Sequence, residues 1–156
     1  MQVDIGAGGK HILLLGHFDT VYELRTLGID RSTVRVLRNG VDLQRFRPLD
    51  RAAARRRLGL ADGRWLLSVG HLIERKGHDI AIKALRDLPG WSLLIAGAGE
   101  LDAMLRGLAA DLGVSDRVRF AGGVPQSELP WYYSAADALV LASSREGWAN
   151  VLLESM

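Results

Sequence analysis

Two carboxylates stand eight positions apart near the end of the chain, and both could bind a ligand that carries hydroxyl groups. Glu146 falls in a stretch of small residues, whereas Glu154 falls on an apolar segment of helical character. An ionised carboxylate only accepts hydrogen bonds, so each one could hold two neighbouring hydroxyls. One glutamate could therefore bind a ribose diol and the other a sugar hydroxyl. The alternative is an exposed glutamate pair on either side of an ordinary helix.

The helix predicted to begin near Asn150 could add an anion site between the two glutamates. Backbone N–H groups around Trp148 to Val151 would have no partner within the helix. The helix dipole favours negative charge at the same end. The sequence therefore predicts that this segment can face a phosphate group.

The composition is typical of one ordinary folded domain. The chain has 156 residues, of which 48% are hydrophobic and 24% are charged, and this is enough to bury a core. The formal net charge is +2, and most basic residues are interspersed with acidic ones. The one dense basic cluster, residues 51–57, lies between Asp50 and Gly59, and no aromatic residues are interleaved with its arginines. We therefore predict a solvated helix face there and no nucleic-acid partner.

The absence of cysteine excludes disulfides and thiolate chemistry, which suits a reducing cytosol. The longest early apolar run, residues 12–15, is far too short to span a bilayer. No charged segment precedes an apolar stretch as it would in a signal peptide. We expect a cytoplasmic protein without a transmembrane segment.

From Trp65 onward, short apolar runs alternate with segments of helical period. Strands are predicted at 65–69, 91–96, 117–120 and 137–142, and helices at 79–88, 100–112, 127–136 and from about 150. This alternation predicts an α/β fold, a Rossmann-like parallel sheet with helices on both faces. Ligands of such sheets bind beyond the carboxyl ends of the strands, and the loops there contain both Lys76 and Glu146.

The last predicted helix reaches the end of the sequence after about two turns, which is shorter than an isolated helix needs to be stable in water. Its final residues contain no Gly or Pro stop signal. We expect a fold that is incomplete at the C-terminus and exposes apolar surface there. Such a surface favours a homodimer or a domain swap.

Four blocks of sequence follow one another in a specific order and spacing. They are residues 36–42 with Phe46 and Pro48, residues 68–77, residues 94–100 and residues 146–154. Together they make the chain from about residue 29 to 156 resemble the donor-nucleotide-binding half of the retaining group 1 glycosyltransferases. That family has two facing Rossmann-like domains. The resemblance implies a UDP-, GDP- or ADP-sugar as donor, no other cofactor, no required metal, and hexosyl transfer with retention in the full enzyme.

The resemblance also implies roles for the candidate site residues. Glu154 would contact the ribose, and Lys76 would neutralise the diphosphate, whose negative charge grows in the transition state. Glu146 and the backbone that follows it would hold the sugar and the distal phosphate; the residues concerned are Gly147, Trp148, Ala149 and Asn150. Val124 would lie near the nucleobase, with simple packing as the alternative.

The sequence does not decide which residue supplies the second cation of the site, because the family usually has arginine where this chain has His71. Arg75 could substitute for it, or His71 could hydrogen-bond a phosphate. The alternative for His71 is a packing role in the loop. Gly70, in the same block, is the remaining predicted donor-binding residue.

Two further patterns favour structure over binding. Residues 97–99 lack the third glycine of a dinucleotide fingerprint, since Asp102 stands in its place, and are predicted to form a tight strand-to-helix turn. Trp131, Tyr132 and Tyr133 could stack on a base, but their amphipathic helical pattern predicts a core role.

Residues 11–21 resemble a different family, the zinc-dependent peptidases of the aminoacylase and desuccinylase superfamily. This resemblance implies that His17 binds a metal and that the Asp19 carboxylate orients a ligand of that metal. A catalytic zinc site needs about three protein ligands, and the other ligands of that family have no matching motif downstream. We therefore expect no zinc hydrolysis.

Because two unrelated signatures meet near Leu27 and Gly28, we predict a junction between a peptidase-like strand–helix segment, residues 1–28, and a partial donor-binding domain, residues 29–156. The leading hypothesis is a chimeric chain whose glycosyltransferase part binds a sugar nucleotide but is inactive without an acceptor domain. The alternatives are an α/β scaffold, chimeric or engineered, with no physiological ligand, and a zinc peptidase fragment.

Overall fold

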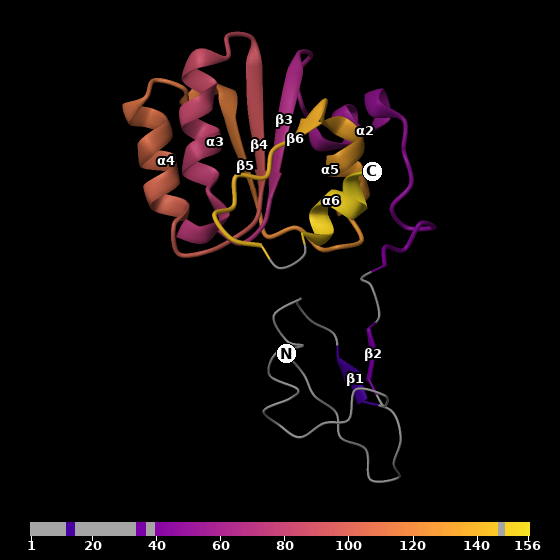
Figure 1. Cartoon of the computed structure of the whole chain (residues 1–156). Coiled ribbons are helices and arrows are strands. Elements are labelled where there is room, and N and C mark those ends of the chain that lie inside the picture. Colours follow the sequence, from indigo (N-terminus) through magenta and orange to yellow (C-terminus); the bar gives the residue numbers. More distant parts are fainter. Residues whose placement is uncertain (1–11, 15–33, 37–39, 147–148) are drawn as a thin grey trace.

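The computed structural model describes residues 12–14, 34–36, 40–146 and 149–156 (Figure 1). Their strands are β1 (Ile12–Leu14), β2 (Val34–Val36), β3 (Arg64–Val69), β4 (Trp91–Ala96), β5 (Val118–Gly122) and β6 (Ala138–Leu139). Their α-helices are α2 (Arg51–Leu58), α3 (His78–Ala84), α4 (Asp102–Asp111), α5 (Leu129–Ala135) and α6 (Asn150–Ser155). Three 3₁₀ turns complete this part of the chain: Glu74–Lys76, Leu85–Asp87 and Ser115–Arg117.

Four of the strands form one parallel sheet in the order β5-β4-β3-β6. The central pair is in register along its whole length, from Arg64 opposite Trp91 to Val69 opposite Ala96. β1 and β2 pair in parallel in a separate two-stranded sheet. The predicted Rossmann-like α/β class is confirmed.

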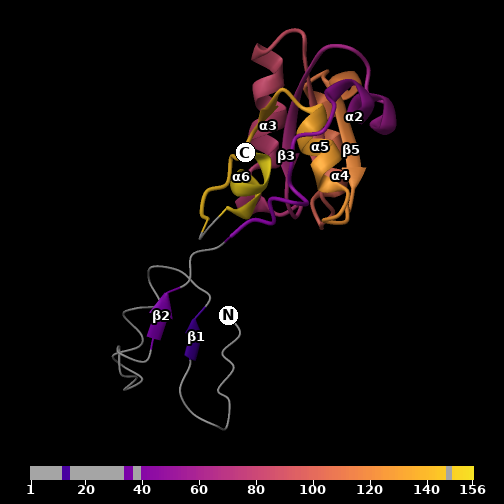
Figure 2. The same ribbon diagram turned by 90° about the vertical axis from the view of Figure 1, so that its right-hand side faces the viewer.

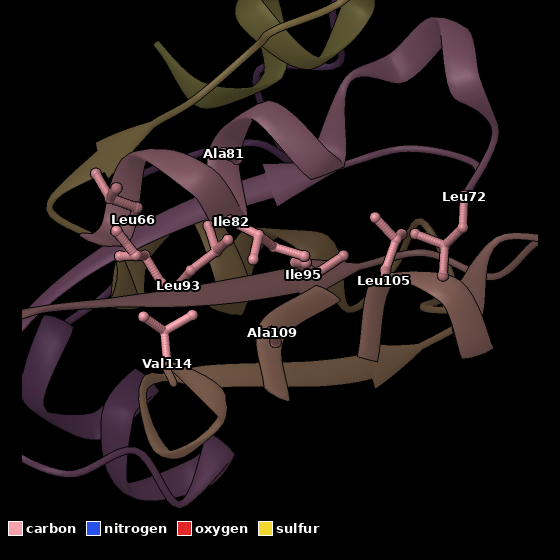
Figure 3. Packing of buried hydrophobic residues seen from close by; sticks show 10 residues of the cluster. Leu66, Leu72, Ala81, Ile82, Leu93, Ile95, Leu105, Ala109 and Val114 are labelled. Carbon is pink, nitrogen blue, oxygen red and sulfur yellow. The ribbon is translucent and has the colours of Figure 1, made fainter. Parts of the chain in front are cut away.

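Helices cover the four-stranded sheet on both faces, because alternate residues of β3 and β4 point to opposite sides and nearly all are buried. On one face, Leu66, Leu93 and Ile95 pack against Ile82 of α3 and Leu105 of α4 (Figure 3). On the other face lies a second core cluster; its members from the strands and α5 are Trp65, Leu67, Val69, Leu94, Ala96 and Leu129. Figure 2 shows α3 and α5 on opposite sides of β3.

The edge strand β6 is shorter than the predicted strand 137–142. It pairs with β3 only through Ala138 and Leu139, and one further backbone bond joins Val140 to Leu67. Beyond this point the chain leaves the sheet, and the backbone of Ala142 lies against Gly77. An edge strand has a neighbour on one side only, so little opposes this departure.

The arginine cluster of α2 is only partly the solvated face that the sequence predicts. Arg51 and Arg55 donate to the Asp137 carboxylate at 2.9 and 2.8 Å, and the same carboxylate accepts the Trp65 backbone N–H at 2.7 Å. The Arg55 side chain is only 16% exposed. The prediction was wrong for Arg55, which the Asp137 carboxylate holds against the protein, whereas Arg51 keeps 59% of its side chain exposed although it contacts the same carboxylate.

The short helix α6 packs on α5 and places Val151 against the second core cluster. Leu152 and Met156 are exposed, in agreement with the predicted apolar surface at this end of the sequence. None of the described helices is long and apolar enough to cross a membrane.

Candidate functional site

Three loops that follow strands meet at the carboxyl edge of the four-stranded sheet. The loop after β3 is joined to the loop after β4, because Leu72 N–H donates to Ala98 O at 3.0 Å and Leu101 N–H donates to Leu72 O at 3.1 Å. It is joined to the loop after β6 by Ser144 N–H, which donates to Arg75 O at 3.0 Å. The loops that the sequence pattern placed at this edge therefore form one backbone-linked surface.

Glycines permit the close approach of these loops. A Cβ atom on Gly97 would overlap the carbonyl oxygen of Gly70, and one on Gly77 would overlap the carbonyl oxygen of Ala142. Gly77 also has a φ of 67°, which L residues with a side chain adopt only at a cost. The prediction that residues 97–99 form a tight strand-to-helix turn is confirmed, since α4 begins at Asp102.

Lys76 and Glu146, which the sequence placed in separate motifs, form an ion pair in this surface. Lys76 Nζ lies 2.6 Å from Glu146 Oε1, and the two side chains are 19% and 21% exposed. The aliphatic part of Lys76 passes over Gly70, where a side chain would be in contact with it. Ammonium and carboxylate are thus held together and largely shielded from water, where a charge-assisted hydrogen bond is stronger than at an open surface.

The Glu146 carboxylate is kept ionised by its surroundings. Burial acts to raise its pKa, but the hydrogen bond from Lys76, the nearby Ser143 hydroxyl and the charges of Lys76 and Arg75 outweigh it and lower the pKa below its ordinary value. Ser143 Oγ is itself buried and makes no hydrogen bond of ordinary geometry to the described residues. Glu146 can therefore act only as an acceptor at neutral pH.

The second glutamate, Glu154, is held by two donors that sequence reasoning did not identify. The Tyr133 hydroxyl donates to Oε2 at 2.8 Å, and Gln126 Nε2 donates to Oε1 at 3.2 Å. Burial, the hydrogen bond and the charge of Glu154 all raise the pKa of Tyr133, so the phenol stays protonated and keeps donating. The need of a partly buried phenol for a partner was a usable signal for Tyr133. No comparable signal pointed to Gln126.

Glu154 also lines an open pocket of about 280 Å³ between α2, α5 and α6. Phe46, Arg47 and Ser134 also line this pocket. Lys76 and Glu146 lie outside this pocket. The candidate site is therefore larger than this pocket, because it also includes Lys76 and Glu146 at the carboxyl edge of the sheet.

The remaining described candidates differ in position. Arg75 is exposed, its guanidinium reaches Arg145 O at 3.5 Å, and its charge acts on Glu146. The His71 side chain is exposed, while Val124 is half-buried and packs against the second core cluster. Ala149 precedes α6 and Asn150 is its first residue. Lys76, Gly70, Arg75 and Glu146 are brought together, and the binding role of each stays a prediction.

Several predicted features lie outside the described residues. These are Gly147, Trp148, His17, Asp19 and the junction near Leu27 and Gly28. Within the described ranges, no three His, Cys, Asp or Glu side chains are grouped so as to hold a metal ion.

A buried histidine that the sequence analysis did not identify supports the loop after β3. His78 is 3% exposed; its Nδ1 lies 2.8 Å from Ser68 Oγ, and its Nε2 lies 3.2 Å from His71 O. Burial lowers the pKa of His78, and the charge of Lys76 acts in the same direction, against hydrogen bonds to the loop backbone and the charge of Asp79. A neutral imidazole therefore connects strand β3 to the loop that carries Lys76.

Acidification is expected to destabilise the domain through His78. Because its pKa is lower in the folded state than the ordinary 6.5, the unfolded chain binds more protons as the pH falls. This contribution to stability is complete above about pH 6.5 and declines below it by up to about 1.4 kcal/mol per pH unit. Urea unfolding from about pH 7.5 to about pH 5 should show a steeper loss for wild type than for His78→Gln. Parallel pH profiles would contradict this role of His78.

The fold and the site define the class of protein: a Rossmann-like α/β domain whose charged side chains gather at the carboxyl edge of the sheet, where such domains bind their ligands. More particularly, the chain belongs to the group 1 glycosyltransferases. The family model described as "Glycosyl transferases group 1" matches residues 50–156. The resemblance inferred from the four sequence blocks is thereby confirmed.

Curated relatives agree with this assignment. The chain is 42% identical over 142 residues to the D-inositol 3-phosphate glycosyltransferase of Acidothermus cellulolyticus, an alignment that covers 82% of this chain and 32% of that protein. It is 41% identical over 125 residues to the lipopolysaccharide core biosynthesis glycosyltransferase LpsE of Rhizobium meliloti, with 80% and 35% covered. The chain therefore spans about a third of the length of these relatives.

Solved structures share the fold. A sucrose-phosphate synthase from Thermosynechococcus elongatus matches with a TM-score of 0.74 and 29% identity, over 92% of this chain and 37% of that one. Anabaena HepE in complex with UDP and glucose matches with a TM-score of 0.76 and 22% identity, over 94% and 42%. These matches support neither alternative hypothesis, the scaffold without a ligand nor the zinc peptidase fragment.

The similarity to glycosyltransferases is not confined to residues 29–156. The D-inositol 3-phosphate glycosyltransferase of Frankia alni is 39% identical, and its alignment covers 90% of the chain, which is more than those residues alone could supply. The division at residue 28 and the chimeric origin of the chain stay predictions.

Proposed function

We propose that this domain binds the nucleoside diphosphate sugar of a retaining group 1 glycosyltransferase. The observation that carries the proposal is the 2.6 Å contact between Lys76 and Glu146 at the carboxyl edge of the sheet. A diphosphate sugar needs a cation beside its phosphates and an acceptor beside its sugar hydroxyls. Lys76 supplies the cation and Glu146 the acceptor, and the two groups are hydrogen-bonded to each other.

Each described charge has one task in this proposal. Lys76 neutralises the diphosphate, which gains negative charge as the glycosidic bond to it breaks, so a fixed ammonium favours the transition state. Glu146 accepts hydrogen bonds from the sugar, and its lowered pKa keeps it ionised for this purpose. Glu154 accepts the ribose hydroxyls. Arg75, whose charge already acts on Glu146, is the second cation of the site.

The ligands of similar proteins support a nucleoside diphosphate sugar as the class of donor. HepE, at 23% identity, has been solved in complex with UDP-glucose. A relative from Mycolicibacterium smegmatis, 38% identical over 114 residues, is a GDP-mannose-dependent mannosyltransferase. UDP- and GDP-sugars are therefore candidates for this chain, and an ADP-sugar stays a prediction from the family resemblance.

We further propose that these 156 residues, when produced on their own, bind donor without transferring its sugar. Transfer requires an acceptor hydroxyl held against the donor carbon, because much of the rate enhancement comes from this orientation and from the exclusion of water. The family relatives devote about two thirds of their length to parts that this chain does not match. We therefore expect binding to be measurable and transfer to be negligible.

Titration calorimetry of the purified chain with UDP, GDP and ADP tests the proposal. We expect saturable binding of at least one of them and a loss of about a hundredfold or more in Glu154→Ala, because the buried ribose hydroxyls lose a charged acceptor worth about 3 kcal/mol. Glu128→Ala is the matched control, since Glu128 is a surface carboxylate paired with Arg57. Binding by neither wild type nor variant, or equal binding by both, would refute the proposal.

A further inference from the structure

The Glu154 carboxylate receives one hydrogen bond on each of its oxygens, from two different elements. Tyr133 belongs to α5, and Gln126 lies in the loop that follows β5. Helix α6, which carries Glu154, is thus connected by side chains to both. The two bonds leave the carboxylate little freedom to rotate.

The two donors together leave part of the hydrogen-bond accepting capacity of the Glu154 carboxylate unused. An ionised carboxylate offers about four lone-pair positions, two on each oxygen. Tyr133 and Gln126 occupy one on each oxygen. One position therefore remains on each oxygen, and this arrangement matches the two adjacent hydroxyls of a ribose.

Each of the two donors has a further contact of its own. Tyr133 is half-buried in the second core cluster and packs edge-to-face on Phe46, with the ring centroids 6.1 Å apart. Gln126 Oε1 accepts a hydrogen bond from Arg45 Nη1 at 3.4 Å, which selects the amide orientation that points the NH₂ group at Glu154. A rigid phenol and an oriented amide can hold a carboxylate in one direction before any ligand arrives.

We propose that Tyr133 and Gln126 are positioning residues that fix the Glu154 carboxylate for recognition of a ribose diol. The inference rests on the proposed function and deepens it, since it assigns ribose selectivity to residues that act through Glu154. Preorganisation of this kind raises affinity, because the side-chain entropy is lost on folding rather than on binding.

The test compares UDP, GDP and ADP with their 2′,3′-dideoxy analogues, by calorimetric titration of wild type, Tyr133→Phe and Gln126→Leu. Tyr133→Phe should weaken binding of the ribose form about tenfold and leave binding of the dideoxy form unchanged. Gln126→Leu, at an exposed loop position, should act in the same direction and leave folding intact. A residue with a merely structural role would weaken both ligands equally.

Tyr132→Phe is the matched control, because the Tyr132 hydroxyl makes no hydrogen bond to any described residue although its ring packs against the same core cluster. It should change neither affinity. Thermal unfolding of each variant shows that the fold is retained.

The outcomes separate the two proposals. If wild type binds none of the nucleoside diphosphates, the proposed function fails and this inference fails with it. If wild type binds and Glu154→Ala does not, while Tyr133→Phe and Gln126→Leu retain the wild-type preference for ribose, the positioning role alone is refuted. Tighter ribose binding by Tyr133→Phe would refute it as well, since it would mean that the tyrosine competes with the ligand for Glu154.

Discussion

The Lys76→Ala variant is expected to bind nucleoside diphosphates about a hundredfold more weakly than wild type. A charge-assisted hydrogen bond to a phosphate contributes about 1.5–3 kcal/mol, and its loss accounts for most of this effect. The variant also leaves the Glu146 carboxylate without the ammonium that lies 2.6 Å from it. The uncompensated carboxylate then repels the phosphates. Calorimetric titration at constant ionic strength measures the change.

Lys83→Ala is the matched control, because it removes the same side chain from an exposed position. Lys83 is 57% exposed and pairs with Asp79 on the surface of α3. Its replacement should leave binding nearly unchanged, since surface pairs contribute little and distant charges are screened. A nucleoside monophosphate should also lose less affinity than the diphosphate in Lys76→Ala. An equal loss for both ligands would place Lys76 away from the diphosphate.

Replacement of Gly97 by alanine is expected to destabilise the domain by about 3 kcal/mol or more. The added Cβ would occupy the position of the Gly70 carbonyl oxygen, so one of the two loops must move. That movement would disturb the Gly70 N–H bond to Ala96 O. Urea unfolding followed by circular dichroism measures the loss.

Gly107→Ala adds the same methyl group but is expected to raise the stability of the domain rather than lower it. Gly107 lies inside α4, and an added Cβ there meets no atom within 4 Å. Alanine is favoured over glycine in a helix by about 0.5–1 kcal/mol, so this variant should be more stable than wild type. If Gly97→Ala were as stable as Gly107→Ala, the close approach of the loops would not be a constraint.

The sequence predicted most of the elements, because local patterns specify them. The strand predicted at 91–96 is β4 with the same bounds, and the helix after Asp50 has the predicted caps. The Asp50 side chain accepts from Ala53 N–H at 2.7 Å, and Gly59 ends α2 in the left-handed conformation. Each of these features depends on residues close together in the chain.

Interactions between distant residues were harder to predict. Nothing near Asp137 in the sequence indicates that it binds α2, and this long-range contact made the solvated-face prediction partly wrong. The partnership of His78 with Ser68 depends on how β3 and the first turn of α3 are juxtaposed, which periodicity does not specify.

The candidate site falls between these two cases. Periodicity placed the loops of Lys76 and Glu146 at the same edge of the sheet, and the family resemblance selected those two residues. The direct contact between the two side chains, at 2.6 Å, is visible only in the structure. The donors to Glu154 were not predicted, because a glutamine in a loop and a tyrosine on an amphipathic helix carry no sign of which carboxylate they will meet.

The Lys76–Glu146 pair also has a consequence for the rate of association. Two opposite charges in contact present almost no net charge to a distant molecule, and the exposed neighbours Glu74 and Arg75 likewise offset each other. Long-range attraction accelerates the encounter of charged partners only when one sign of charge dominates the site. The Lys76–Glu146 pair would therefore add little to the on-rate of an anionic nucleotide, and its effect would be on the residence time, through the contacts formed after arrival.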